Sequence, residues 1–493
     1  MTRRIGPSTY VAYGAADMFG SGAMAVINSW VLFFYTSFCG LTALQATAIF
    51  GIARILDAVS GTVIGHWSDV IGATWIGRRF GRRRAFLLLS LPLMPCFALM
   101  WVSGQSFLYY LATYLFFEVL YASVLIPYET LAAEMTDDYR VRARLAGARI
   151  LTGQAAVFLS SILPAWITGG KAAATAHTFF LMGAIFSAIF IASVLVTYLF
   201  TWERERTAPP PRLGLGDLLR NAGSTFRIRA FRQHLGVYLG GFTANDVAAA
   251  TFTYFIVFVV GGSVAQASLL LGVMTAAQFA SVIVFTWLTT RIGPARAFQL
   301  AASASIAGLL LMTVVVLVPM PIAPLAALLP VVVVAGFGRG GIVYVPWHSY
   351  NYIADVDEIV TTRRREGVFA GVMTMVRKAV GAAAIALVGL LLDAFGFVPQ
   401  ATAQPASART AIMLALVVVP VVSMLLGMLV SRRFILGPAS HAVLMDEIAR
   451  LRGGDRRPPA DDVAPVISGL TGVGNDRLWA GQLDLRPLQA ERR

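Results

Sequence analysis

The chain alternates between long apolar runs and short polar connections along most of its length. A helix needs about 20 residues to cross a hydrocarbon layer of roughly 30 Å, and twelve of the runs approach or exceed that length. The runs are continuously apolar, which favours helices over the alternating strands of a membrane barrel. The pattern therefore predicts an all-α membrane protein with twelve transmembrane helices. The predicted spans fall near residues 9–35, 43–67, 85–103, 107–134, 147–169, 177–200, 235–261, 266–290, 297–319, 325–352, 368–392 and 410–431.

A basic segment with several prolines interrupts this pattern after the sixth span. An internal repeat supports a division there. IPYETLAAEMTDDYRVRARLAG, from residue 126, and VPWHSYNYIADVDEIVTTRRREG, from residue 345, share one order of proline, aromatic, acidic and arginine residues. Such repeats are common in secondary transporters. We expect two pseudo-symmetric six-helix bundles (1–201 and 235–436), a cytoplasmic linker (202–234) and a loosely ordered cytoplasmic tail (437–493).

The composition agrees with a membrane location. The chain is 57% hydrophobic and only 13% charged, and its mean hydropathy is +0.72, which excludes an ordinary soluble domain. The net charge of +14 raises the question of nucleic acid, but the arginines gather in alternate connections, such as 78–84, 140–144 and 363–365. The positive-inside rule then places both termini in the cytoplasm. We expect a multi-pass protein of the inner cell membrane that binds no nucleic acid.

Ionisable residues inside the predicted spans are few, and each is costly unless it is paired or hydrated. Spans three, six, nine and twelve carry none. This rhythm is expected if every third helix faces lipid while the others surround a water-filled cavity. The ionisable residues include Asp17 in span one, Arg54 and Asp57 in span two, Glu118 and Glu129 in span four, Arg149 at the start of span five, Asp246 in span seven, Arg339 in span ten and Lys378 in span eleven.

Two of the predicted helices carry polar residues on one face. Positions that are four, seven and eleven residues apart share a face of an α-helix. Asp17, Ser21 and Asn28 have this spacing in span one, and Glu118 and Glu129 have it in span four. We interpret both faces as cavity lining. The alternative is that they make polar contacts between packed helices.

Arg54 and Asp57 lie one turn apart, so they could simply neutralise each other. The functional alternative is that Asp57 is a coupling site whose charge is balanced in turn by a cation and by the protein. Only Lys171 and Lys378 are lysines, with arginine at all other cationic positions. A desolvated lysine can lose its proton whereas an arginine cannot, so we predict a coupling or gating role for Lys378. Arg377 points about 100° away, toward the membrane surface or a helix interface.

Motifs in six parts of the chain follow a known order. They are Tyr13, Gly14 and Asp17; ARILDA (53–58); GHWSD (65–69) with GRRRAF (81–86); IPYETLAAEMTDDYRVR (126–142); ADVDE with RRREGVF (354–369); and VRKAVG (376–381). Over nearly all of 9–434 the chain resembles the glycoside–pentoside–hexuronide:cation symporter family, the melibiose-permease-like group of the major facilitator superfamily. The resemblance implies the major facilitator fold, alternating access, and uptake of sugars or glycosides with Na⁺ or H⁺. One eukaryotic branch of the family carries lysolipids.

The resemblance also implies roles for single residues. Asp57 matches the cation-site aspartate of the melibiose permease, and Arg149 and Lys378 match family residues at the sugar site and near the cation site. Gly61 stands where that permease has its second cation-site aspartate. Two carboxylates suit Na⁺, which wants several oxygen ligands. With one carboxylate, we favour H⁺ over Na⁺ as the coupling ion and expect Arg54, Asp57 and Lys378 to serve it.

The sugar-binding positions differ from the family pattern. Ser21 and Leu125 stand where the melibiose permease has sugar-binding aspartates. A simple galactoside is therefore an unexpected substrate, and Glu129, Asp17 and Asp246 are expected to contact the substrate instead. The predicted substrate-binding residues are Asp17, Ser21, Asn28, Tyr128, Glu129, Arg149, Asp246 and Trp347. Of these, Tyr128 and Trp347 are chosen as rings that could stack on a sugar face, although such rings more often serve packing.

A cytoplasmic loop after span two resembles the gating loop of the superfamily. Its residues are Gly65, Asp69, Arg82, Arg83 and Arg84. Salt bridges and helix-end contacts there would hold the outward-open state and break on closing. The alternative is a plain cluster of positive charge that sets the topology, and both can hold at once.

The leading hypothesis is a secondary active symporter of a sugar-like polar solute. A lysolipid or lipid-like carrier on the same fold is the alternative, and a wide apolar groove would favour it. An enzyme is not expected, since no HExxH, no GxSxG and no metal-spaced His/Cys cluster occurs. A channel fits dispersed single charges in repeated halves less well than alternating access does. We expect a monomer without cofactor or bound metal, with H⁺ as the coupled ion.

Overall fold

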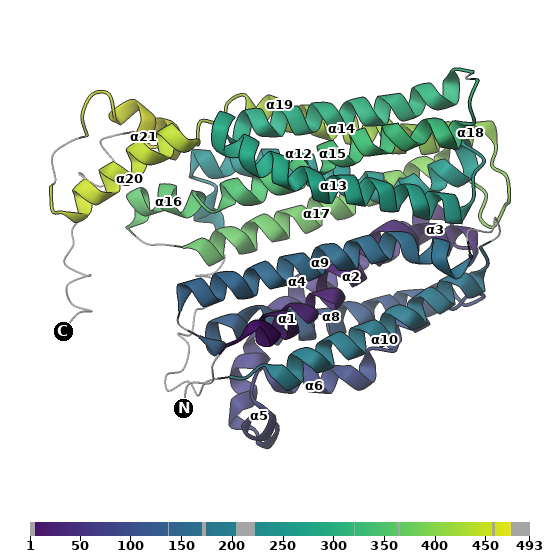
Figure 1. Ribbon diagram of the computed structural model, residues 1–493, viewed down its shortest axis with the longest axis horizontal. Coiled ribbons are helices and arrows are strands. Elements are labelled where there is room, and N and C mark those ends of the chain that lie inside the picture. Colours follow the sequence, from purple (N-terminus) through teal and green to yellow (C-terminus); the bar gives the residue numbers. More distant parts are fainter. Residues whose placement is uncertain are drawn as a thin grey trace.

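The computed structural model describes residues 5–136, 138–169, 174–203, 222–319, 321–362, 365–455 and 459–474, apart from a few side chains within helices. The described residues form helices and loops. Figure 1 shows two groups of long helices that lie side by side, with α1 to α10 in one group and α12 to α19 in the other. We call these groups the first half and the second half.

The first half contains the first six predicted spans. The long α8 and α9 begin at side-chain caps, where Ser106 and Asp138 accept hydrogen bonds from backbone N–H groups of the first turn. The elements are α1 (Pro7–Ala15), α2 (Asp17–Val26), η1 (Ile27–Val31), α3 (Leu32–Ser37), α4 (Ala43–Val70), η2 (Ile71–Ala73), α5 (Trp75–Phe80), α6 (Arg84–Ser90), η3 (Leu91–Leu93), α7 (Cys96–Leu99), α8 (Phe107–Met135), α9 (Tyr139–Ile167) and α10 (Ala176–Phe200).

The second half follows with the same kind of helix. Its first span starts at Arg229, earlier than the predicted 235, because Phe231 is buried and extends the apolar face. The elements are α12 (Arg229–Tyr254), η4 (Phe255–Val259), α13 (Val264–Ile292), α14 (Pro294–Leu317), α15 (Pro324–Tyr350), α16 (Ile353–Thr361), α17 (Glu366–Ala394), α18 (Ala406–Met413), η5 (Leu414–Val418), α19 (Val419–Ser431), α20 (Pro438–Arg452) and α21 (Ala464–Thr471). Residues 204–221 of the predicted linker lie outside the described residues, so its limits stay a prediction.

Within the described residues, ten helices are long and apolar enough to cross a membrane. Two predicted spans are not among the ten. The second is α4, which is 28 residues long but carries Arg54 and Asp57. The third was predicted as one helix over 85–103, but Pro92 and Pro95 break it into α6, η3 and α7. Proline has no backbone N–H to donate, so it interrupts the helical ladder. The all-α class is confirmed, and a count of twelve crossings is consistent with these elements.

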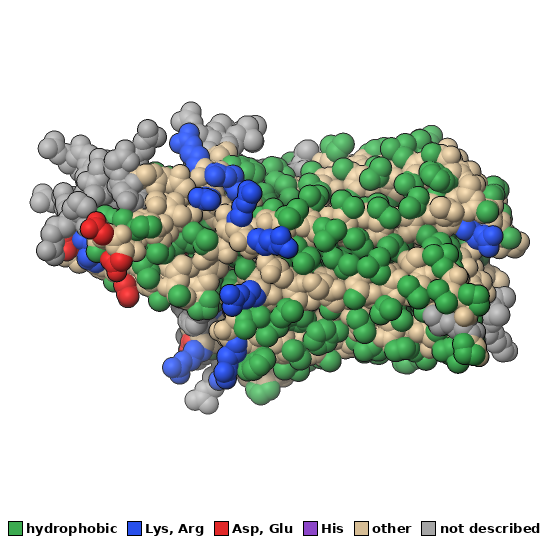
Figure 2. Space-filling view, turned by 90° about the horizontal axis from the view of Figure 1, so that it is seen from above, with side chains coloured by type: hydrophobic (Ala, Val, Ile, Leu, Met, Phe, Trp, Pro, Cys, Tyr) green, Lys and Arg blue, Asp and Glu red, His purple; other side chains and the backbone are tan. Residues whose placement is uncertain are grey.

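Charge and apolar surface are separated along the molecule. We call the end that carries α5, α16 and α20 the basic end, and the opposite end, where α3 stops and α18 begins, the far end (Figure 1). Figure 2 shows apolar side chains over most of the visible surface, with Lys and Arg mainly toward the basic end. This is the distribution expected of a helical bundle that sits in lipid.

The segment after Gly437 differs from the expected loosely ordered tail. It forms α20 and α21, whose apolar faces bury Leu444, Ile448 and Ile467 against α12, α16 and α17. An amphipathic helix folds when a partner covers its apolar stripe, and here the second half supplies that partner. The expectation was therefore wrong for the helical part of the tail. Residues 475–493 lie outside the described residues.

Candidate functional site

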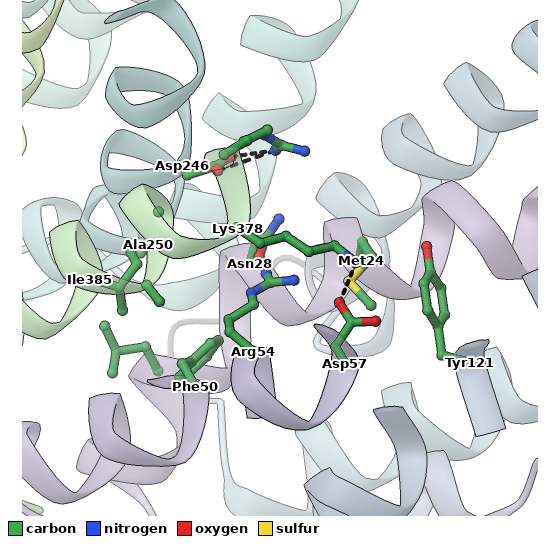
Figure 3. A pocket seen from close by; sticks show the side chains of 14 residues that line it. Met24, Asn28, Phe50, Arg54, Asp57, Tyr121, Asp246, Ala250, Lys378 and Ile385 are labelled. Carbon is green, nitrogen blue, oxygen red and sulfur yellow. Dashed lines mark hydrogen bonds and ion pairs between the residues drawn. The ribbon is translucent and has the colours of Figure 1, made fainter. Parts of the chain in front are cut away.

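A cavity of about 160 Å³ lies between the two halves, midway along α4 and α17 (Figure 3). Its lining comes from α2, η1, α3, α4 and α8 of the first half and from α12 and α17 of the second. These are spans one, two, four, seven and eleven, all of them charge-bearing, whereas the charge-bearing spans five and ten contribute no residue to this lining. The polar members are Asn28, Arg54, Asp57, Tyr121, Asp246, Arg377 and Lys378.

An ion pair between the halves crosses this cavity. Lys378 extends from α17 and pairs with Asp57 on α4, whose side chain is 8% exposed (Figure 3). The α4 face places Phe50, Arg54 and Asp57 toward the cavity because they are spaced four and three residues apart. Asp57 and Lys378 were predicted to act together in coupling, and the structure brings them into contact.

The pairing of Arg54 with Asp57, one of the two alternatives, is not formed among the described residues. Arg54 lines the cavity from α4 and makes no ion pair within the described part of the chain. Gly61 lies one turn beyond Asp57, and a methyl group there would meet only Ile126, at 3.8 Å. Among the described side chains, the position of the missing family carboxylate is therefore unoccupied.

A second ion pair holds the second half together at the same cavity. Arg377 pairs with Asp246 of α12 at 3.1 Å, and its guanidinium lies 4.5 Å from the ring centre of Phe242. Asn245 donates to Asp246 at 3.3 Å. Arg377 therefore faces the α12–α17 interface, one of its two expected directions, and it also lines the cavity. The sequence signal for this role of Arg377 was Asp246, because a carboxylate within a membrane helix needs a cation from a helix packed against it.

Another group of predicted residues forms a separate cluster inside the first half. Arg149 of α9 pairs with Asp17 of α2 at 3.2 Å and with Glu129 of α8 at 2.6 Å. Ser21 donates to Asp17 at 2.8 Å, and the Arg149 guanidinium lies 5.3 Å from the ring centre of Tyr128. These five residues were predicted as substrate-binding together with Asn28 and Asp246. Only the latter two lie in the cavity.

The distance between the two groups follows from the helix that joins them. Asp17 and Asn28 are eleven residues apart along span one, which is roughly 16 Å at 1.5 Å per residue. The Arg149 cluster lies toward the basic end. The close packing of α2 and α9 in this cluster requires Gly153, because a methyl group there would lie 2.2 Å from an Asp17 carboxylate oxygen. Sequence reasoning missed Gly153, which carries no chemistry of its own.

Trp347 is placed away from both groups. It is 42% exposed on α15 and packs its ring against Tyr238 and Tyr350, with ring centres 5.9 and 6.0 Å away. It does not line the cavity. Its position gives no support to the predicted contact with substrate. Instead, it fits the packing role that such rings more often have.

The predicted gating loop forms a compact polar cluster at the basic end of the first half. Arg82 and Arg83 both pair with Glu134 of α8, and Arg83 also donates to Ser68 of α4. Arg84 donates to the Tyr198 carbonyl at 2.8 Å. A methyl group at Gly65 would meet none of the described residues within 4 Å, so no close approach seen there requires that glycine. The side chain of Asp69 lies outside the described residues.

Glu203 completes this cluster and was missed from the sequence. Its carboxylate accepts hydrogen bonds from the backbone N–H groups of Arg82 at 2.9 Å and Arg83 at 2.7 Å, and from that of Arg84. It thereby caps the start of α6. Burial raises the pKa of the Glu203 carboxyl above its ordinary value, while the three backbone donors act in the opposite direction.

Polar contacts between the halves gather at the far end. The Tyr254 hydroxyl donates to the Leu32 carbonyl at 2.8 Å, and the backbone N–H of Gln400 donates to the Thr36 carbonyl at 3.0 Å. Ser161 and Thr275 hydroxyls lie 3.1 Å apart in the α9–α13 contact. The two halves are thus tied together beyond the cavity on the side away from the arginines.

Known proteins give an independent comparison. The family described as MFS/sugar transport protein matches residues 12–437. An uncharacterized symporter of Synechocystis sp. is 26% identical, covering 89% of this chain and 95% of the relative. A glucuronide carrier protein homolog of Escherichia coli is 24% identical, covering 82% and 87%. Among solved structures, a bacterial homolog to the human lysosomal transporter Spinster aligns with a TM-score of 0.62 at 17% identity, covering 88% and 98%.

These matches confirm several expectations. The relatives are membrane transporters and symporters, which agrees with the transport function expected here and gives no indication of an enzyme family. The structural match supports the fold alone. The resemblance stated from the sequence motifs is confirmed by a family match that spans both halves.

Proposed function

Since the chain belongs to the MFS/sugar transport protein family and is a multi-span membrane symporter, we propose that it couples a sugar-like polar solute to protons by alternating access. The contact between Asp57 and Lys378 carries this proposal. The pair lines the cavity and joins two halves that must separate and rejoin. Protonation of Asp57 would remove its charge and release Lys378. Binding of a proton is thereby linked to the tie between the halves.

The ligand set at this pair favours a proton over Na⁺. Na⁺ is a hard cation that requires several oxygen ligands. Asp57 offers one carboxylate that already faces an ammonium group, and Gly61 offers none. A proton needs only the single carboxylate. We therefore keep H⁺ as the proposed coupling ion.

The charges around the cavity point to an acidic sugar. The lining contains three cations and two carboxylates. Arg377 pairs with Asp246 and Lys378 pairs with Asp57. Arg54 is the remaining cation and has no ion pair among the described residues. A guanidinium binds a carboxylate through two parallel hydrogen bonds. A uronic acid or glucuronide would supply that carboxylate, and a glucuronide carrier homolog is among the relatives. A charged lining is a poor match for the apolar groove that a lysolipid carrier would need.

Orientation and assembly follow from the same features. By the positive-inside rule, we propose that the basic end faces the cytoplasm of an inner-membrane protein. The cavity lies between the two halves of one chain. We therefore propose the monomer as the transporting unit, with no cofactor and no nucleic-acid partner.

The test is uptake into proteoliposomes under an imposed pH gradient, with para-nitrophenyl β-D-glucuronide as the probe. We expect accumulation that needs the gradient and not Na⁺. Asp57→Asn should abolish accumulation while leaving exchange of probe across the membrane. Asp446→Asn, the same substitution at an exposed position on α20, is the matched control. Undiminished accumulation in Asp57→Asn would remove the coupling assignment, and accumulation driven by Na⁺ alone would remove the proton.

A further inference from the structure

A carboxyl group outside the cavity lining lies directly behind its wall. Glu118 of α8 has an exposed fraction of 0%. Tyr114, Glu118 and Tyr121 are spaced four and three residues apart, so they share one face of α8. Tyr121 lines the cavity, and the ring of Tyr114 lies 5.3 Å from that of Phe50, which also lines it. Glu118 is therefore held between two residues that touch the cavity or its wall.

The surroundings of Glu118 do not satisfy an ionised carboxylate. Neither carboxylate oxygen has a hydrogen-bond partner among the described residues, and the same holds for the buried Tyr114 hydroxyl. The charged side chains that surround Glu118 are Arg54 and Asp57 of α4 and Lys378 of α17. No ion pair to Glu118 forms within the described part of the chain. An ionised carboxylate without water or a partner is strongly unfavourable in such a place, whereas a neutral carboxylic acid is tolerated.

We propose that Glu118 is a proton-binding site of the transport cycle, occupied in the state shown. The proposal rests on the proposed function in one respect, namely that the carried ion is a proton. It distinguishes the two acids near Arg54: Asp57 has Lys378 as an ion-pair partner, while Glu118 holds a proton because neither an ion pair nor a hydrogen bond among the described residues satisfies its carboxylate. The second acid that is missing at Gly61 is thus supplied from α8.

The chemistry of the cycle follows from Arg54. With Glu118 protonated, Arg54 faces the cavity while the two carboxylates of the lining are paired with Arg377 and Lys378, so it can hold an acidic group of the solute. When water reaches Glu118, its O–H bond breaks and the proton leaves with that water. The carboxylate that remains then attracts Arg54 and withdraws the guanidinium from the solute. Proton release and solute release are thereby linked through one side chain.

Infrared spectroscopy of the purified full-length protein tests this without any solute. Near neutral pH, the wild type should show the carbonyl band of a protonated carboxylic acid, and the band should fade as the pH is raised. Glu118→Gln should lack that band, and Glu118→Asp should keep it at a shifted position. Asp57→Asn should retain it. A wild-type spectrum without the band, or an unchanged band in Glu118→Gln, overturns the proposal.

A second readout separates this site from a merely structural one. In proteoliposomes, Glu118→Gln, which imitates the protonated acid, should lose accumulation under a pH gradient but keep exchange of the glucuronide probe. A structural defect would lower both. Failure of the proposed function can be told apart from failure of this proposal. A Na⁺-driven carrier would show no accumulation under a pH gradient, whereas the infrared band reports the protonation of Glu118 independently of transport. Asp446→Asn again serves as the control.

Discussion

Asp393, near the end of α17, accepts a hydrogen bond from the backbone N–H of Leu44 at 2.9 Å and another from that of Ala43 at 3.0 Å. The two N–H groups belong to the first turn of α4, whose partial positive charge favours a carboxylate. Asp393 therefore caps a helix of the opposite half. These hydrogen bonds join the two halves at the far end, so they have to break when the protein opens outward.

We predict that Asp393→Ala opens the far end more often. A hydrogen bond to a charged group contributes about 1.5–3 kcal/mol, so its loss should shift the equilibrium by roughly tenfold or more. Cys39 is a natural probe there, since it is buried beside Phe38, whose carbonyl accepts from Gln400 at 3.2 Å. The rate of Cys39 alkylation by a maleimide should rise by a similar factor. An unchanged rate would show that Asp393 does not hold this end closed.

The pH dependence of that labelling has a definite sign. Burial raises the pKa of the Cys39 thiol to about 12, so the reactive thiolate is scarce in the closed state. Opening returns the thiol toward its ordinary pKa near 9. Labelling of Asp393→Ala should therefore be faster than that of the wild type at every pH below 9, and its rise with pH should begin to level off near 9, whereas the slower wild-type rate should still be climbing. Cys96, buried in α7, is the internal reference and should stay unlabelled in both.

Lys378→Ala should weaken both coupling and stability. It leaves the buried Asp57 without its cation, and breaking such a pair costs up to a few kcal/mol, reduced here to about 2 kcal/mol because Lys378 is 32% exposed. A lower melting temperature and no gradient-driven accumulation are expected. Adding Asp57→Asn to Lys378→Ala should restore the melting temperature and not the accumulation. A single variant with wild-type behaviour in both measurements would contradict the assignment.

Gly153→Ala should disrupt the Arg149 cluster. The added methyl group would lie 2.2 Å from an oxygen of Asp17 and 2.7 Å from that of Ser21, so one of them has to move. Overpacking of this kind costs about 1–3 kcal/mol, seen as a lower melting temperature. Gly147→Ala on the same helix is the control, because a methyl group there meets none of the described residues within 4 Å. Equal effects of both substitutions would mean that helix propensity, and not this contact, is decisive.

Glu203→Gln tests the basic-end cluster through its pH dependence. Burial raises the pKa of Glu203 in the folded protein, so the folded form holds the proton more tightly than the unfolded chain. The stability gained this way is present below the ordinary pKa of 4.5 and is lost as the pH rises through the folded value. The wild type should therefore gain stability relative to Glu203→Gln as the pH falls through that window. A pH-independent difference in melting temperature would contradict this.

The sequence was sufficient for the elements that depend on local pattern. Apolar runs of span length specify membrane helices, and isolated charges within them must meet water or a partner, which is why Asp57, Lys378 and Asp246 were found. Pro92 and Pro95 also mark the break in the third span, but the continuous apolar run led to the prediction of a single helix there. Each of these features depends on residues close together in the chain.

The remaining features depend on how distant helices pack. Nothing near Asp57 indicates that its partner is Lys378 and not Arg54, since this depends on the approach of α17 to α4. Arg149 of α9 pairs with Asp17 of α2 and Glu129 of α8, so the separate cluster of predicted substrate residues depends on the packing of three helices. Glu203 could not be recognised because its partners are backbone N–H groups.

Two adjacent residues of α17 form ion pairs with different helices: Lys378 pairs with Asp57 of α4, and Arg377 pairs with Asp246 of α12. About 100° separates the directions of the two side chains, so α17 cannot rotate about its own axis without weakening at least one ion pair. The helix therefore links the two halves through two separate ion pairs. A proton or a solute that breaks one pair would allow α17 to rotate toward the helix that it still contacts, so a local change in charge would be converted into a movement of one bundle relative to the other.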